Sequence, residues 1–241
     1  MSTSLVWNNQ NGTLAIDRNN LRDFYAQSLQ NYLPSVCFLV EAHCEVNEIM
    51  NCTMSASIRP GGHPSLTETA GDTVLSYSYS NQSHDGAGFN DQIGSLTIST
   101  NYNMDIQFTN ANNDATVLIT QHLVLNYDSE MLSAEGSGNI IDKTIVETYT
   151  LTVDESGILG TTVDPVITDN STPFENSDWN PFTGSDGFIQ ELRSQGDSLQ
   201  QTSMLNIPLS DKATYSFPGG QNSTFKSVQF SDDQDLVASV A

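Results

Sequence analysis

Three cysteines and one histidine lie in one short stretch and are the first candidates for chemistry. Cys37, Cys44 and Cys52 are the chain's three cysteines, and His43 precedes Cys44. Structural zinc sites pair their ligands at shorter spacings, and strand alternation would place His43 and Cys44 on opposite faces. An odd, clustered set of cysteines is also not a disulfide framework. We therefore expect neither a metal nor a cofactor.

Cys44 and Cys52 would face each other if residues 38–46 and 50–58 form a hairpin turning near Glu48. Directly opposed Cβ atoms lie about 4.5–5.5 Å apart, which just admits a disulfide after small adjustment. Nothing in the sequence indicates an oxidising compartment. Two reduced cysteines packed as small apolar residues are therefore the favoured interpretation, and a disulfide is the alternative.

Other residues have the types needed for catalysis but not the arrangement. Residues 83–85 read Ser-His-Asp, but a catalytic triad is assembled in space, and the following Gly86 is typical of a turn. The acidic run 232–235 lacks the spacing and the glycine of a calcium loop. The common nucleophile, metalloprotease and phosphate-binding motifs are missing. We interpret the protein as a non-enzyme, and expect no convergence on one cleft of His43, His63, His84 and His122.

Acidity is the strongest compositional feature. Asp and Glu total 29 against 7 Lys and Arg, for a formal net charge of −22. The few cations are scattered, and phosphate backbones need a basic patch, so no nucleic-acid partner is expected. No signal peptide follows Met1, and no apolar run reaches about 18 residues, so we expect a soluble chain without a transmembrane segment. Its compartment is unknown, and strand-like residues up to Ala241 suggest a longer parent chain.

One amphipathic helix is predicted over residues 18–33. Its apolar face recurs at intervals of three and four residues and consists of Leu21, Phe24, Tyr25, Leu29, Tyr32 and Leu33. Asp17 can cap the first turn and Pro34 ends the last one. The helix should therefore lie with its aromatic face on an apolar surface.

Alternation of apolar and polar residues predicts strands in most of the remaining chain. The longest pair is 96–108 with 115–127, and further strands are expected at 73–80 and 143–153. Thirteen residues extend roughly 43 Å, more than twice an ordinary strand. Strands of this length twist, so we expect them to bend around something. The buried side chains should be Leu96, Ile98, Tyr102, Ile106, Val117, Ile119, Leu123 and Leu125.

Polar and glycine-bearing segments separate these elements. Residues 81–94 are predicted to form a loop, and residues 165–187 a long polar connection. A second, weaker amphipathic helix is indicated by Phe188, Ile189, Leu192 and Leu199. Two last strands are expected from Phe225 and Leu236.

Together these elements predict one α+β domain over residues 1–241, mostly antiparallel β, with long curved strands wrapped around one or two amphipathic helices. In architecture only, this resembles the tubular lipid-binding proteins, in which a long curved sheet wraps a helix and leaves an apolar tunnel. No motif of that family matches this sequence, so no functional residue can be assigned from the resemblance. The pattern suggests a non-enzymatic binding protein that holds an apolar, lipid-like molecule or docks a protein partner. Candidate wall residues are Phe24, Tyr32, Tyr102, Met104, Phe108 and Tyr127; packed core is the alternative for all six.

A second functional class is a carbohydrate-binding or glycoside-cleaving β protein. Such a protein would use exposed aromatic rings beside carboxylates, with Trp7, Tyr79 and Trp179 as candidate rings. A pair of carboxylates for glycoside cleavage cannot be chosen from 29 acids by sequence.

The predicted helix is tested by two substitutions on its opposite faces. Leu21→Asp should destabilise the protein by several kcal/mol, because it buries an unpaired charge. Gln27→Asp on the polar face should change stability by less than about 0.5 kcal/mol. Equal midpoints for the two variants in urea melts would show that the face is misassigned.

Overall fold

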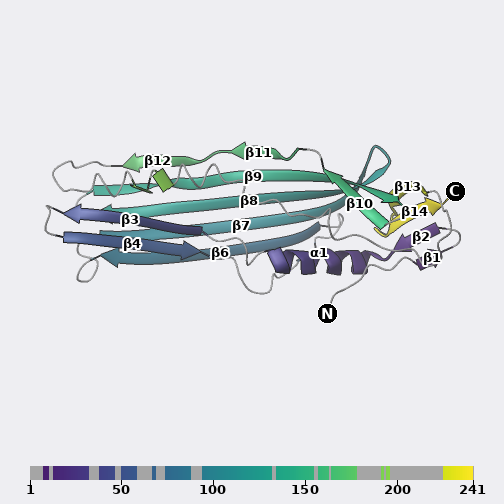
Figure 1. Cartoon of the computed structure of the whole chain (residues 1–241), viewed down its shortest axis with the longest axis horizontal. Coiled ribbons are helices and arrows are strands. Elements are labelled where there is room, and N and C mark those ends of the chain that lie inside the picture. Colours follow the sequence, from purple (N-terminus) through teal and green to yellow (C-terminus); the bar gives the residue numbers. More distant parts are fainter. Residues whose placement is uncertain are drawn as a thin grey trace.

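The computed structural model describes residues 8–10, 13–32, 38–46, 50–58, 67–68, 74–87, 94–131, 134–154, 157–162, 164–177, 191–192, 194–195 and 225–240. Within these ranges the chain is mostly antiparallel β with one α-helix, as predicted at that level. Figure 1 shows long strands running side by side, with a separate hairpin at one end and a small sheet beside the C-terminus at the other.

The largest element is an open eight-stranded sheet in the order β10-β9-β8-β7-β6-β5, with β11 and β12 also paired to β9. Its strands are β5 Thr67–Glu68, β6 Val74–Ala87, β7 Gly94–Ala111, β8 Asp114–Met131, β9 Ala134–Asp154, β10 Gly157–Thr162, β11 Val166–Asp169 and β12 Thr172–Ser177. Strands β10, β11 and β12 pair with successive parts of β9. These three short strands therefore share one edge of the sheet.

The central hairpin β7–β8 is the long pair that the alternation predicts. Its strands pair in continuous register from Gly94↔Met131 to Ala111↔Asp114. Asn112 and Asn113 form the turn with φ of 54° and 70°, left-handed values that asparagine tolerates in two-residue hairpin loops. All eight side chains predicted to be buried are at most 2% exposed. Both the pairing and the buried face are confirmed.

Two segments that read as polar connections contain strands. Residues 81–87, predicted as part of a loop, continue β6 and pair with β7 as far as Ala87↔Gly94, so this part of the loop prediction is wrong. Within residues 165–187, Val166–Asp169 and Thr172–Ser177 pair with β9. In both cases a neighbouring strand supplies backbone partners, and this pairing overrides low intrinsic strand propensity.

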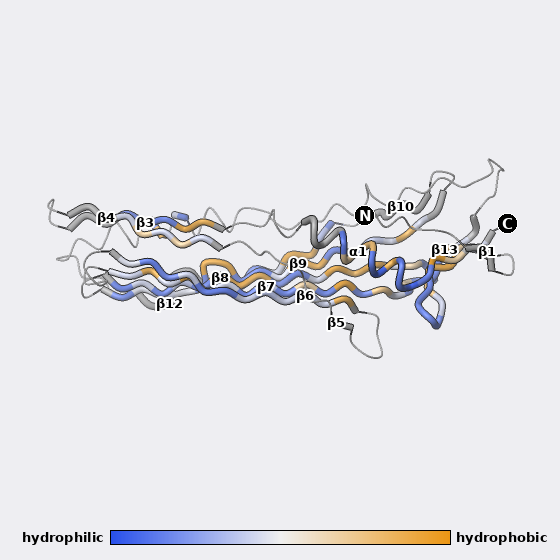
Figure 2. The backbone as a smooth tube through the Cα atoms, turned by 90° about the horizontal axis from the view of Figure 1, so that it is seen from below, coloured by the Kyte–Doolittle hydropathy of each residue, from blue (hydrophilic) through white to orange (hydrophobic). Residues whose placement is uncertain are grey.

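A separate hairpin forms a second layer over one end of the large sheet (Figure 2). It consists of β3, Phe38–Val46, and β4, Met50–Ile58, in the predicted register of Val46↔Met50 and Cys44↔Cys52. The two cysteine side chains lie outside the described part, so their oxidation state stays a prediction. Asp85 of β6 accepts hydrogen bonds from Ser55 of β4, at 2.9 Å from N–H and 3.3 Å from Oγ.

The predicted first helix is α1, Arg18–Tyr32, capped by Asp17 Oδ1 at 2.8 Å from the Asn19 amide. Leu21 and Tyr25 are buried, as the helical period requires. Of the second predicted helix, residues 191–192 and 194–195 are helical and Leu192 is buried, and its remainder lies outside the described residues. Within the described ranges, no helix combines the length and the hydropathy needed to cross a membrane.

A small four-stranded sheet joins the two ends of the described chain. Its order is β1-β2-β14-β13, from Asn8–Gln10, Thr13–Ile16, Leu236–Val240 and Phe225–Phe230. The side chain of Asn110, at the tip of β7, donates to Phe230 O and accepts from Phe230 N, each at 2.8 Å. These two bonds tie β13 to the end of the long hairpin.

The bond between Asp85 and Ser55 predicts how firmly the hairpin is attached. Asp85→Ala should destabilise the protein by about 1–3 kcal/mol, because it leaves the Ser55 N–H without its charged acceptor. Hydrogen exchange should quicken for β3 and β4 more than for β7 and β8. Asp128→Ala, an exposed carboxylate on β8, is the matched control. Equal effects of the two substitutions would contradict this role of Asp85.

Candidate functional site

The large sheet has two unlike faces. The covered face carries alternate buried side chains of β7, β8 and β9 and lies under the β3–β4 hairpin and α1 (Figure 2). The open face carries mainly Ser, Thr, Asn and Gln, together with acids such as Asp105 and Asp128. No lysine or arginine lies on the open face among the described residues of β6 to β9. The covered face is therefore where an apolar ligand could be held.

The candidate wall residues of the β7–β8 hairpin meet on the covered face. Tyr102 and Met104 are fully buried, Phe108 is 3% exposed and Tyr127 is 4% exposed. From α1, Phe24 is partly buried against the same core. The Tyr32 side chain lies outside the described part. The structure thus brings the five described residues into one packed surface, and the role of all six as ligand walls remains a prediction.

Aromatic rings link α1 and β13 to this surface at one end of the sheet. The ring centres of Tyr25 in α1 and Phe108 are 5.3 Å apart, and those of Phe108 and Phe230 in β13 are 5.7 Å apart. Nearer the middle of the sheet, the rings of Tyr77 and Tyr102 are 6.0 Å apart. Tilted and edge contacts at these distances stabilise such clusters by about 0.5–1.5 kcal/mol per pair beyond simple burial.

Buried polar side chains interrupt the apolar surface. Gln121 is 0% exposed and accepts a 2.8 Å hydrogen bond from the Tyr102 hydroxyl. In register, Gln121 lies opposite Ile145 and therefore diagonal to Lys143, which is 8% exposed. The sequence signal was available, since Gln121 occupies an apolar position of the alternating pattern. A polar residue at an apolar position indicates a polar group inside the core, and a search for catalytic motifs does not detect such a residue.

Glu147 is a carboxylate buried on the same face. It is 4% exposed and accepts a 3.3 Å bond from the Tyr149 hydroxyl. Burial, followed by the charge and the hydrogen bond of Glu147, raises the pKa of Tyr149 well above its ordinary value. Burial likewise raises the pKa of Tyr25. Both phenols therefore stay protonated, and the Tyr149 hydroxyl remains a donor to Glu147.

Lys143 connects the covered face to the sheet edge. Its Nζ lies 3.5 Å from Oδ2 of Asp169 in β11. Desolvation opposes ionisation of Asp169, but hydrogen bonds from Ser171 and the nearby Lys143 outweigh it and lower its pKa. Because the Asp169 side chain is 39% exposed, solvent screens the pair and its contribution is small. Its main consequence is that the buried ammonium has a charged partner.

Thr100 places an unsatisfied polar atom on the covered face. The residue is 1% exposed, and its Oγ1 has no hydrogen-bond partner among the described residues. Its neighbours in register are Asn81 of β6 and Leu125 of β8. A buried hydroxyl without a partner is costly, so Thr100 is a position where a ligand atom or a water could bind.

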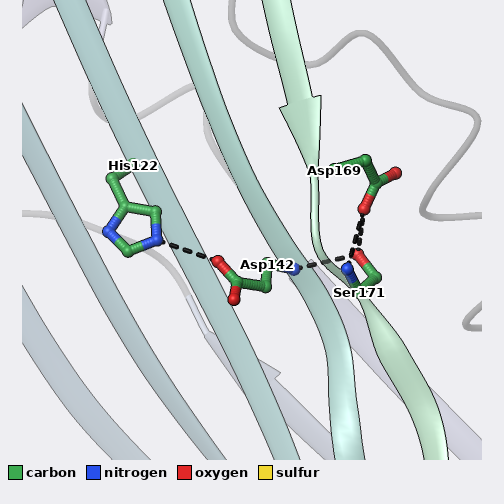
Figure 3. Close-up of polar contacts among 4 residues, drawn as sticks. All are labelled: His122, Asp142, Asp169 and Ser171. Carbon is green, nitrogen blue, oxygen red and sulfur yellow. Dashed lines mark hydrogen bonds and ion pairs between the residues drawn. The ribbon is translucent and has the colours of Figure 1, made fainter.

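A second polar group, on β8, β9 and the turn between β11 and β12, contains Ser, His and Asp (Figure 3). His122 Nε2 lies 2.9 Å from Asp142 Oδ1, and the Asp142 amide donates to Ser171 Oγ at 2.9 Å. The Ser171 hydroxyl bonds to Asp169, not to His122. Without a nucleophile–base hydrogen bond the group is not a catalytic triad. It anchors the β11–β12 turn to β9, as does the bond from Asn170 N to Asp142 O.

The described histidines have separate partners on different strands. His43 of β3 lies 3.9 Å from Glu191, His84 of β6 lies 2.9 Å from Thr97, and His122 pairs with Asp142. His63 lies outside the described residues. No cluster of three metal-binding side chains occurs within the described ranges. The interpretation as a non-enzyme remains a prediction.

The carbohydrate hypothesis rests on rings that the structure describes only in part. Tyr79 is half-buried and packs against the covered-face core, and burial raises its pKa. The carbohydrate hypothesis stays a prediction. Trp7 and Trp179 lie outside the described residues.

Comparisons of the chain with protein-family models, with curated proteins and with solved structures found no match. Function must therefore be inferred from the residues and geometry of the covered face.

Thr100 gives a direct test of the unsatisfied hydroxyl. Thr100→Val keeps the side-chain shape and removes the polar atom, so it should stabilise the ligand-free protein by about 1–3 kcal/mol. Thr120→Val on the open face should change stability by less than about 0.5 kcal/mol. Urea melts of both variants measure the difference. A loss of stability in Thr100→Val would show that the hydroxyl has a partner.

Proposed function

We propose that this protein is a non-enzymatic binding protein that holds an apolar, lipid-like molecule against the covered face of its large sheet. The observation that carries the proposal is the length and composition of this face. Strands β7 and β8 each span 18 residues, roughly 60 Å at about 3.3 Å per residue. In the proposal, these strands curve around α1 and the hairpin, and the ligand lies between sheet and cover.

The polar groups of the covered face suit this role. Ligand sites are mostly apolar and contain a few placed polar groups that set orientation. Here the Tyr102–Gln121 pair, the unsatisfied hydroxyl of Thr100 and the Lys143 ammonium lie near one another on β7, β8 and β9. They supply one polar region within a long apolar surface, which suits a ligand with a long apolar chain and a polar end.

The way the hairpin is attached gives the ligand a route. Strands β3 and β4 form their own two-stranded sheet, and the described backbone ladders of the large sheet do not include them. Asp85 binds Ser55 through its side chain, and Val40, Ala42, Met54 and Ala56 pack inward. The hairpin can therefore separate without breaking a strand ladder. Since the four wall residues on β7 and β8 are at most 4% exposed, entry requires such a separation.

Docking of a protein partner is the second candidate function. Among the residues whose side chains are described, three large apolar ones are more than half exposed: Leu39 at 52%, Val166 at 65% and Ile167 at 51%. Val166 and Ile167 lie on β11, at the edge of the large sheet. Exposed apolar side chains on strand edges favour contact with another chain.

Cross-linking the hairpin to the sheet tests the apolar-ligand proposal. Wild-type protein should bind cis-parinaric acid with enhanced fluorescence, and native mass spectrometry should show co-purified apolar molecules. A Ser55→Cys/Asp85→Cys variant should bind at least tenfold more slowly when oxidised, because the cover cannot separate, and should recover on reduction.

The control is Asn103→Cys/His122→Cys, which joins directly opposed residues on the open face. Its uptake of the probe should be the same when oxidised and reduced. Absence of any probe binding to the wild-type protein contradicts the function. Equal uptake by the locked and unlocked variants contradicts the route.

A further inference from the structure

The outer edge of β3 is closed by side chains instead of a strand. In the described residues, β3 pairs with β4 alone. The Glu41 amide donates to Gln195 Oε1 at 2.8 Å, and the His43 amide donates to Glu191 Oε2 at 2.6 Å. The Gln195 side-chain amide also donates to the Glu41 carbonyl. Both backbone groups of Glu41 are therefore satisfied as a neighbouring strand would satisfy them.

The match between helix and strand spacing explains how two side chains imitate a strand. Glu191 and Gln195 are four residues apart in a helical turn, a rise of about 6 Å. Glu41 and His43 are two residues apart in a strand, a rise of about 6.6–6.8 Å. Residues separated by four in a helix share a face, as do residues separated by two in a strand. The two side chains thus reach successive outward amides of β3.

We propose that the outer edge of β3 is a docking edge for an extended segment of a protein partner, and that Glu191 and Gln195 close it by imitating that segment. Binding of a strand to a sheet edge uses the outward amides and carbonyls that these side chains now occupy. Leu192, between them, is 3% exposed and holds the helical turn against the core. The fold therefore holds Glu191 and Gln195 in place at the edge of β3. Their contacts with β3 are nevertheless side-chain hydrogen bonds, which a strand can replace.

The surroundings of the edge indicate the chemistry of the partner. On the solvent-exposed face of β3, the Leu39 side chain is 52% exposed, and Glu41 and His43 are also exposed. The chain has a formal net charge of −22. A complementary segment places basic residues on the exposed face, opposite Glu41, since cross-strand pairs of opposite charge are favourable. Its alternate apolar residues then lie on the inward face, beside the buried Val40 and Ala42. A second copy of this acidic chain lacks that complementarity.

The experiment uses a fluorescein-labelled peptide, acetyl-Val-Lys-Val-Lys-Val-Lys-Val-amide, as the basic strand. Its control is the same peptide with alternate backbone nitrogens methylated, which keeps the charge and removes the hydrogen-bonding edge. The opened protein is Glu191→Ala/Gln195→Ala. The matched protein control is Glu135→Ala/Gln82→Ala, which removes one exposed carboxylate and one exposed amide elsewhere on the large sheet. Gln195→Ala alone serves if the double variant does not fold.

We expect the opened variant to bind the unmodified peptide at least tenfold more tightly than wild type or the matched control, with no gain for the methylated peptide. Hydrogen exchange of the Glu41 and His43 amides should quicken in the opened variant, and the peptide should slow it again. Equal binding of both peptides would mean simple charge attraction and overturns the proposal, as does unchanged exchange at the two amides. Dimerisation of the opened variant in sedimentation, without peptide binding, would replace the partner with a second copy and overturns the assignment of a basic partner.

Discussion

The fold depends on burying one face of a very long antiparallel ladder. Strands β7 and β8 pair without interruption over 18 residues each, and strict alternation puts Leu96, Ile98, Ile119 and Leu125 on the same side. A ladder of this length satisfies its backbone internally but leaves a long, mainly apolar stripe facing water. At about 25 cal/mol per Å² of apolar surface, such a stripe is too costly to leave exposed. Every other described element can be understood by how it covers or extends this sheet.

Two kinds of cover protect the stripe, and they are attached differently. At one end, α1 and β13 pack by aromatic contacts through Phe108 and by the bonds of Asn110 to Phe230. At the other end, the β3–β4 hairpin is attached through the side chain of Asp85 and is closed on its outer edge by Glu191 and Gln195. Side-chain bonds can exchange with other partners at lower cost than a full ladder. Both proposed binding events, an apolar molecule under the hairpin and a strand beside it, follow from this difference in attachment.

The polar residues within the core show which features the alternating sequence pattern predicts and which it does not. The alternation identified Tyr102, Met104, Phe108 and Tyr127 as inward-facing because strand geometry alone determines the side on which a residue lies. It did not reveal that Gln121 meets the Tyr102 hydroxyl, or that Lys143 pairs with Asp169, because those contacts depend on register and on the path of β11. The Ser-His-Asp letters at residues 83–85 proved to belong to a strand, in which Asp85 secures the hairpin.

The sequence by itself determined the local elements whose period is strong: the capped helix from Arg18, the β3–β4 register with Cys44 opposite Cys52, and the buried face of the long hairpin. These follow from interactions between residues near in sequence. Only the tertiary structure decided that residues 81–87 extend β6, that the edge of β9 is shared by three short strands, and that Glu191 and Gln195 close β3. In each of these cases the backbone partner lies elsewhere in the chain. Weak local preferences then yield to the requirement that buried and edge hydrogen-bonding groups be paired.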